Sequence, residues 1–482
     1  MRRLVIALTT GVLATTALTA GTGQAGSTTT TMRWTPCADA PEVECGTLAV
    51  PLSWSAPRGA KITLSVARRP ADDPAHRVGT VFFNPGGPAD PSTDYVKSAE
   101  HFFSATLRSR FDIVAMDPRG VGASTPVVCA SPMLAADVTL FPRSRADFER
   151  LRQFNAEAGK GCLDGAGALV GHVDTISAAR DHEALRLAMG ERQITWFGIS
   201  YGTQLAINYA ALYPTATRAM VLDAALEHSG SETAMLAEEI RTVEDSFNRF
   251  AAWCATDDTC ALKGKDVARV YDDLVARADR NPIPVPGALR PVTGEDIRMG
   301  TPHLLTLKEP SVYGPDVSWA ALSRAIKAAI DEGDASAFAL PPTEFQGRIG
   351  QLLSIGCMDY VSEVKSWDDM RQRIQLGRQL APHLQGATEQ WQVLRCIDWP
   401  VPAANPFRRL DVRGVPALIV NATHDPSTSY AWAHGLLGQI EGSALLTRIG
   451  DGHTSYYTSA CARAATDAYL VRPQAPADRI CT

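Results

Sequence analysis

A five-residue stretch, Gly198-Ile199-Ser200-Tyr201-Gly202, constrains this chain more than any other. The residues from Gln193 to Phe197 before it are typical of a buried strand, and Thr203 to Ala210 after it are typical of a helix. A Gly-x-Ser-x-Gly pattern between a strand and a helix is a nucleophile elbow, a turn so tight that small residues must flank the serine. The start of the helix also points backbone N–H groups at the place where negative charge develops in acyl transfer. We therefore predict that Ser200 is a catalytic nucleophile.

Short apolar runs, separated by helical segments, recur along much of the chain. An alternating segment and six continuous runs predict strands at 61–68, 78–84, 111–116, 194–197, 219–222, 417–420 and 444–446. Continuous runs of this kind are typical of a mostly parallel sheet that helices cover on both faces. Together with the elbow, they predict an α/β protein with the α/β-hydrolase fold.

The interval from 229 to 404 has a different character, because it lacks convincing buried strands. Glu232 to Ala255 carries apolar side chains along one helical face, and further helices are predicted around 266–280, 317–332 and 367–380. We predict that residues 34–228 and 405–482 form the two parts of the hydrolase core. Residues 229–404 would then be a mainly helical cap inserted between them.

A serine nucleophile requires a base within hydrogen-bond reach and an acid that orients the base. Asp425 follows the next-to-last predicted strand, and His453 follows the last one. The chain order Ser200, Asp425, His453 is the order expected of an α/β-hydrolase triad. Asp223, which ends the strand after the elbow, is an alternative acid.

An oxyanion hole requires two backbone N–H donors. The first should be Tyr201, directly after the nucleophile. The second should come from Asn84-Pro85-Gly86-Gly87-Pro88, which follows an earlier strand and in which paired glycines let the backbone approach a ligand closely. We assign it to Gly87, with Gly86 as the alternative. This chemistry requires no metal or organic cofactor, and no Cys-x-x-Cys or His cluster indicates a metal site.

The N-terminus has the features of a signal peptide. A basic start at Met1-Arg2-Arg3 precedes a run of apolar and small residues from Leu4 to Ala20, and Gly23-Gln24-Ala25 then offers small residues for cleavage. We predict a signal peptide at 1–25, a linker or short pro-segment at 26–33, and a secreted, extracellular protein; an uncleaved anchor is the alternative. No later apolar stretch is long enough to span a bilayer, so no stable membrane association is expected.

Ten cysteines in an exported chain imply disulfides. Their spacing suggests five sequential pairs: Cys37 with Cys45, Cys129 with Cys162, Cys254 with Cys260, Cys357 with Cys396, and Cys461 with Cys481. The net charge of −6 and the absence of a Lys/Arg stripe argue against a nucleic-acid partner. Nothing in the sequence specifies an oligomeric state.

Several motifs together resemble secreted actinobacterial tripeptidyl aminopeptidases, which are related to proline iminopeptidases. The motifs are Asn84-Pro85-Gly86-Gly87-Pro88, Asp117-x-Arg119-Gly120-x-Gly122-x-Ser124, Gly198-x-Ser200-Tyr201-Gly202-Thr203, Asp425-Pro426-x-Thr428, Gly452-His453 and the cysteine layout. The resemblance runs from about Trp34 to Cys481. It implies a serine exopeptidase that releases short peptides, often tripeptides, from free N-termini. It also implies cap acids that bind the substrate ammonium, for which the candidates are Glu232, Glu238, Glu239, Glu244 and Asp359.

Three positions depart from the family pattern. Ala89-Asp90 continues the glycine loop where further glycines are usual, Ser429 replaces a usual proline, and Thr454 replaces a usual glycine. The first of these reshapes the loop beside the predicted oxyanion hole. The alternative function is therefore an esterase or amidase that acts on a small non-peptide substrate with the same triad. A non-catalytic binding protein on a hydrolase scaffold is a third possibility, against which the intact Ser, Asp and His argue.

Overall fold

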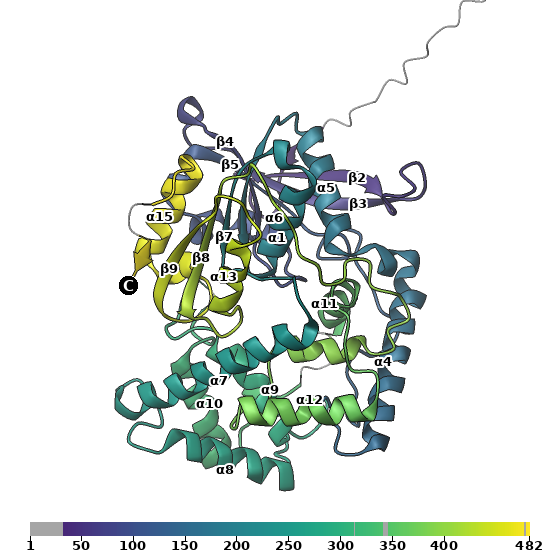
Figure 1. Ribbon diagram of the computed structural model, residues 1–482, viewed down its shortest axis with the longest axis vertical. Coiled ribbons are helices and arrows are strands. Elements are labelled where there is room, and N and C mark those ends of the chain that lie inside the picture. The colour runs from purple at the N-terminus through teal and green to yellow at the C-terminus, as the bar shows by residue number, and fades with distance from the viewer. Residues whose placement is uncertain (1–31, 313, 341–345, 477–478) are drawn as a thin grey trace, which may run out of the picture. The chain divides into compact units, whose positions relative to one another are not determined.

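The computed structural model describes residues 32–312, 314–340, 346–476 and 479–482. The predicted signal peptide and residues 26–31 of the predicted linker lie outside the described residues. A ten-stranded sheet forms the core, in the order β1-β2-β3-β5-β4-β6-β7-β8-β9-β10 (Figure 1). The pairs β1–β2, β2–β3 and β3–β5 are antiparallel, and all the later pairs are parallel.

The strands are β1 (Thr35–Pro36), β2 (Glu44–Pro51), β3 (Lys61–Arg69), β4 (Gly79–Asn84), β5 (Phe111–Met116), β6 (Ile194–Ile199), β7 (Thr217–Asp223), β8 (Ala417–His424), β9 (Ala444–Asp451) and β10 (Ile480–Cys481). Every residue of β6 is buried, as expected of a central strand that helices cover on both faces. Consecutive side chains along β4, and likewise along β6, point to opposite faces of the sheet. Phe82 and Trp196 belong to one apolar cluster, and Phe83 and Phe197 belong to the other.

Helices cover both faces of this sheet. On one face pack α5 (Thr175–Ala188), α6 (Tyr201–Leu212) and α13 (Tyr430–Leu437). On the other face pack α1 (Ser92–Lys97), α2 (Ala99–Phe102), α3 (Ala105–Arg110), α14 (Ser455–Thr458) and α15 (Ala460–Val471). The mostly parallel sheet with two helical layers confirms the predicted α/β-hydrolase fold.

A second group of helices lies between β7 and β8 in the sequence and beyond one end of the sheet (Figure 1). It contains α7 (Glu232–Thr256), α8 (Val267–Arg280), α9 (Gly294–Leu305), α10 (Trp319–Asp331), α11 (Gln346–Asp359), α12 (Trp367–Leu380) and the 3₁₀ segment η6 (Gln390–Cys396). We call this group the cap. The predicted apolar face of α7 is buried, as Leu236, Val243 and Phe247 illustrate.

One helix outside the predicted cap segment also contributes to the cap's apolar core. The first half of α4 (Arg145–Ala166) places Phe148 and Leu151 in the same cluster as the buried side chains of α7 and α8, whereas its second half packs Ala158 and Cys162 against the sheet domain. The apolar core of the cap is therefore built from two separate stretches of the chain.

Five disulfides join the cysteines in the pairing that the spacing suggested: 37–45, 129–162, 254–260, 357–396 and 461–481. The Cys357–Cys396 bond links the last turn of α11 to the end of η6 within the cap. Within the part of the chain that the structure describes, no helix combines the length and the apolar character needed to cross a membrane.

Candidate active site

Ser200 lies in a sharp turn between β6 and α6, with φ 54° and ψ −127°. This is a strained backbone conformation for a residue with a side chain. The Ser200 N–H donates to the Asp223 carbonyl at 3.0 Å, which ties the turn to β7. A side chain at Gly198 would collide with the Gly202 carbonyl, and one at Gly202 would collide with the Asn84 carbonyl. Both glycines are therefore required by close backbone packing around the serine.

Asp425 and His453 follow adjacent parallel strands, β8 and β9, and meet at the carboxyl edge of the sheet. His453 Nδ1 donates to the Asp425 carboxylate, at 2.9 Å from Oδ2 and 3.0 Å from Oδ1. Asp425 is fully buried and also accepts the N–H groups of Ser427 and Thr428 and the Thr428 hydroxyl, each at 2.9 Å. These bonds fix the tautomer of His453 and leave Nε2 as the proton acceptor.

The electrostatics of this pair favour a basic His453. Burial opposes protonation of the imidazole, but the charge and hydrogen bond of Asp425 outweigh burial, so the pKa of His453 rises above its ordinary value. The charges of Glu389 and Asp223 act in the same direction. An imidazole held in this way is suited to take a proton from a hydroxyl near neutral pH.

The carboxylate of Asp223, the alternative acid, binds backbone N–H groups of the segment after His453. It accepts the N–H of Ser455 at 3.0 Å and the N–H of Tyr456 at 2.7 Å. Burial raises the pKa of this carboxyl, although those two hydrogen bonds and nearby cationic groups lower it. Asp223 therefore anchors the segment that follows His453, whereas Asp425 is the carboxylate that contacts the ring.

The glycine loop after β4 approaches the elbow closely. An ideal Cβ on Gly86 would lie 2.9 Å from the Ser200 Cβ and 3.2 Å from the Tyr201 nitrogen. The Gly86 N–H is already donated to Asn84 Oδ1 at 3.0 Å. The Gly87 N–H has no acceptor among the described residues, and Gly87 lines the same pocket as Ser200 and Tyr201.

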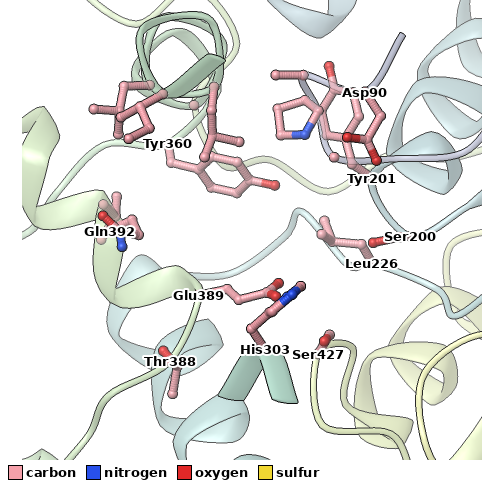
Figure 2. Close-up of a pocket in the computed structure, with 18 of the residues that line it drawn as sticks. Asp90, Ser200, Tyr201, Leu226, His303, Tyr360, Thr388, Glu389, Gln392 and Ser427 are labelled. Carbon is pink, nitrogen blue, oxygen red and sulfur yellow. The ribbon is translucent and has the colours of Figure 1, made fainter. Parts of the chain in front are cut away.

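A cavity of about 560 Å³ opens above Ser200, between the sheet domain and the cap. Its apolar wall includes Leu226, Met299, Leu352, Tyr360 and Val393. This volume lies within the range of small-molecule and short-peptide sites. Figure 2 shows Ser200 on one side of the cavity and cap residues, among them His303, Thr388, Glu389 and Gln392, on the other.

Among the described residues, two acidic side chains line this cavity, and their surroundings differ. Asp90, in the altered loop after the paired glycines, forms an ion pair with Arg348 of α11. Glu389, just before η6, has no hydrogen-bond or ion-pair partner for its carboxylate within the described parts of the chain. Figure 2 shows Glu389 directed into the cavity beside His303. Of these two acids, Asp90 is neutralised by an ion pair and Glu389 is not.

The five acids considered for ammonium binding lie elsewhere, since none of them lines the cavity. Glu232 forms a buried ion pair with Arg373, and Glu238 pairs with Arg241 on the exposed side of α7. Glu239 is buried, Glu244 accepts the backbone N–H groups of residues 383 and 384, and Asp359 is held by Thr175 and Asn405. Sequence reasoning missed Glu389, because it lies in an irregular segment with no periodic pattern to mark it.

Comparisons with known proteins show similarity to α/β-hydrolases. The family described as alpha/beta hydrolase fold matches residues 79–282, and the family described as TAP-like protein matches residues 382–481. Serine protease Hip1 of Mycobacterium tuberculosis is 29% identical over 481 residues, covering 92% of this chain and 89% of that protein. Tripeptidyl aminopeptidase of Streptomyces coelicolor is 27% identical over 447 residues, covering 89% and 81%. Carboxylesterase B of M. tuberculosis is 28% identical over 458 residues, covering 88% and 84%.

Proposed function

We propose that this chain, which belongs to the α/β-hydrolase enzyme family and is a serine hydrolase, is an aminopeptidase that releases short peptides from free N-termini, tripeptides foremost. The observation that carries the proposal is Glu389, an acid without a charged partner among the described residues, in the cavity above Ser200. A carboxylate in that position offers a charge-assisted hydrogen bond to a substrate ammonium.

In the proposed mechanism, Ser200 attacks the scissile carbonyl and His453 accepts its proton through Nε2. Asp425 holds the ring and stabilises the imidazolium. The N–H groups of Tyr201 and Gly87 stabilise the oxyanion. His453 then donates the proton to the leaving amine, and water hydrolyses the acyl-enzyme by the same route.

The cap supports an exopeptidase over an endopeptidase. Cap residues line the cavity opposite Ser200, which favours a short substrate end there. A free N-terminus meets Glu389 there, whereas an acylated N-terminus would leave that carboxylate unpaired in a partly enclosed site. The relatives named as a serine protease and a tripeptidyl aminopeptidase point to the same chemistry.

We further propose that the enzyme is secreted. Five disulfides in a chain of this length are typical of oxidising compartments. The predicted signal peptide at 1–25 would supply the export signal. N-terminal sequencing of the mature protein tests this directly, because cleavage after Ala25 would leave Gly26 as the first residue.

Three substrates test the proposed activity: a tripeptide anilide with a free amine, its N-acetylated form, and a simple acyl ester. Cleavage of the free peptide with little cleavage of the blocked one is the expected result, with Ser200→Ala as the inactive control. Mass spectrometry of the products from a peptide mixture then gives the length of the released fragment.

The second candidate is an esterase that acts on a small non-peptide ester, which the similarity to carboxylesterase B favours. The same triad serves both reactions, so the fold does not separate them. Rapid ester turnover without cleavage of either peptide would establish the esterase and overturn the aminopeptidase.

A further inference from the structure

Two side chains on the cap helix α7, one helical turn apart, contact the loops that carry the acid and the histidine. His424 Nδ1 donates to Asp245 Oδ2 at 2.7 Å, and His424 directly precedes Asp425. Arg249 Nε donates to Asp451 Oδ1 in an ion pair, and Asp451 lies two residues before His453. Residues four apart lie on the same face of a helix, so one face of α7 reaches both loops.

The end of α9 adds a second cap contact to the histidine loop. The His453 N–H donates to the Thr306 carbonyl at 2.7 Å, and Lys308 Nζ lies 3.7 Å from Asp451 Oδ2. The two catalytic loops are also joined to each other, because the Gly452 N–H donates to the His424 carbonyl at 3.0 Å. Each loop is therefore held from the cap side, and a shift in one is transmitted to the other.

The core holds the histidine loop through two side chains, Asp223 after His453 and Arg448 before it. Arg448 of β9 donates to the carbonyls of Asp451 at 3.0 Å and Gly452 at 2.6 Å. These bonds fix the backbone, whereas the Asp451 carboxylate, only 9% exposed, is bound from the cap. The loop that carries His453 is thus contacted by Arg448 from the sheet and by Arg249 from the cap.

We propose that Asp245 and Arg249 are positioning residues. Asp245 acts through His424 and Arg249 through Asp451, and together they fix the loops that carry Asp425 and His453 relative to each other. The proposal rests on the roles given to Ser200, Asp425 and His453 under the proposed function. Neither residue touches substrate. Their contribution is geometric, because misplacing a catalytic group by about 1 Å can cost about 100-fold in rate.

The exposure of these contacts separates a positioning role from a stabilising one. The side chains of Asp245, His424 and Arg249 are 49%, 32% and 37% exposed. The Asp245–His424 pair, exposed on both sides, contributes about 0.2–1 kcal/mol to stability. Removing Asp245 should therefore leave the melting temperature nearly unchanged while turnover falls, whereas removing Arg249 also leaves the 9% exposed Asp451 carboxylate without its nearest cation.

The test compares Arg249→Gln and Asp245→Ala with Arg241→Gln, a matched control. Arg241 lies on the same helix and pairs with Glu238 in an exposed i,i+3 contact. With an acyl ester as substrate, kcat should fall about 10- to 100-fold in the two test variants, with KM within about twofold. The second-order rate of Ser200 labelling by a fluorophosphonate should fall in parallel in both, and the melting temperature of Asp245→Ala should change by less than about 2 °C.

A conservative variant and the pH profile complete the experiment. Asp245→Asn keeps an acceptor for His424 and should retain most of the activity. The acid limb of the labelling profile should move to lower pH in Asp245→Ala, because Asp245 holds the Asp425 loop through His424 and a displaced Asp425 raises the pKa of His453 less. If Arg249→Gln and Asp245→Ala match Arg241→Gln in kcat, or change KM alone, the positioning role is overturned. The ester readout keeps this outcome separate from the choice between peptide and ester, which depends on wild-type cleavage of the peptides.

Discussion

Replacing Glu389 with glutamine removes the one cavity carboxylate for which the described residues provide no partner, while keeping its size. If this carboxylate binds the substrate ammonium, the loss should appear only with substrates that carry a free amine. Peptides with a blocked amine and acyl esters make no use of the charge. Comparing the two kinds of substrate in Glu389→Gln therefore separates ammonium binding from any effect of the charge on the triad, which every substrate shares.

The size of the effect follows from the surroundings of Glu389. A hydrogen bond to a charged group contributes about 1.5–3 kcal/mol. Because Glu389 is exposed within the cavity, solvent screens its charge, which places the loss at the lower end, about 1.5–2 kcal/mol. At about 1.36 kcal/mol per factor of ten, kcat/KM for the free tripeptide anilide should fall about 10- to 30-fold.

A second readout comes from His453, whose pKa the charge of Glu389 helps to raise. In Glu389→Gln the acid limb of the pH–rate profile should shift to lower pH with every substrate, ester included. The matched control is Glu441→Gln, which removes one negative charge from an exposed position that does not line the cavity. Neither the peptide rate nor the acid limb should change in the control.

Two results would refute this reasoning. Cleavage of the free peptide within about twofold of the wild-type rate would show that Glu389 does not bind the ammonium. An equal loss on peptide and ester would show that the carboxylate acts on the triad and not on the substrate.

Four further predictions follow from the site. Asp425→Ala should lower kcat by about 10⁴-fold and leave the fold intact, whereas Asp223→Asn should mainly lower the melting temperature. If Asp425→Ala retained its activity, the role of the acid would move to Asp223. Activity should fall as the pH drops through the raised pKa of His453, because only the neutral ring accepts a proton, and Asp425→Asn should move that limb to lower pH. Gly202→Ala should abolish fluorophosphonate labelling, since its Cβ would collide with the Asn84 carbonyl; wild-type labelling would contradict the packing described. Non-reducing peptide mapping should recover the five sequential disulfides, and any crossed pair would contradict them.

The elements around Ser200 were predictable because local pattern and tertiary environment agree there. β5 spans Phe111–Met116 and α12 spans Trp367–Leu380, as their apolar patterns predicted. Central strands are buried on both faces and therefore carry continuous apolar runs. The chain order of elbow, acid and histidine then follows from the order of these strands.

The cap was harder to predict for physical reasons that particular residues illustrate. Pro302 lies inside α9, where a proline ordinarily indicates a break. The first half of α4 packs into the cap although β6, β7 and two α-helices follow before the cap segment begins, and no local pattern records that contact. The role proposed for Glu389 depends on what surrounds it in space, so it could not be derived from its place in the sequence.

The disulfide between Cys357 and Cys396 has a consequence for where the enzyme can be selective. Cys396 lines the cavity. Its disulfide joins α11, which contributes Leu352 to the cavity wall, to the segment that carries Glu389. The turn around Ser200 contains no cysteine and depends on backbone packing alone. Loss of this one disulfide would thus release the segment that carries Glu389 from α11 without removing any covalent link within the turn around Ser200. If Glu389 binds the substrate amine as proposed, a protein that lacks only this bond should keep Ser200 labelling and lose its preference for substrates with a free amine.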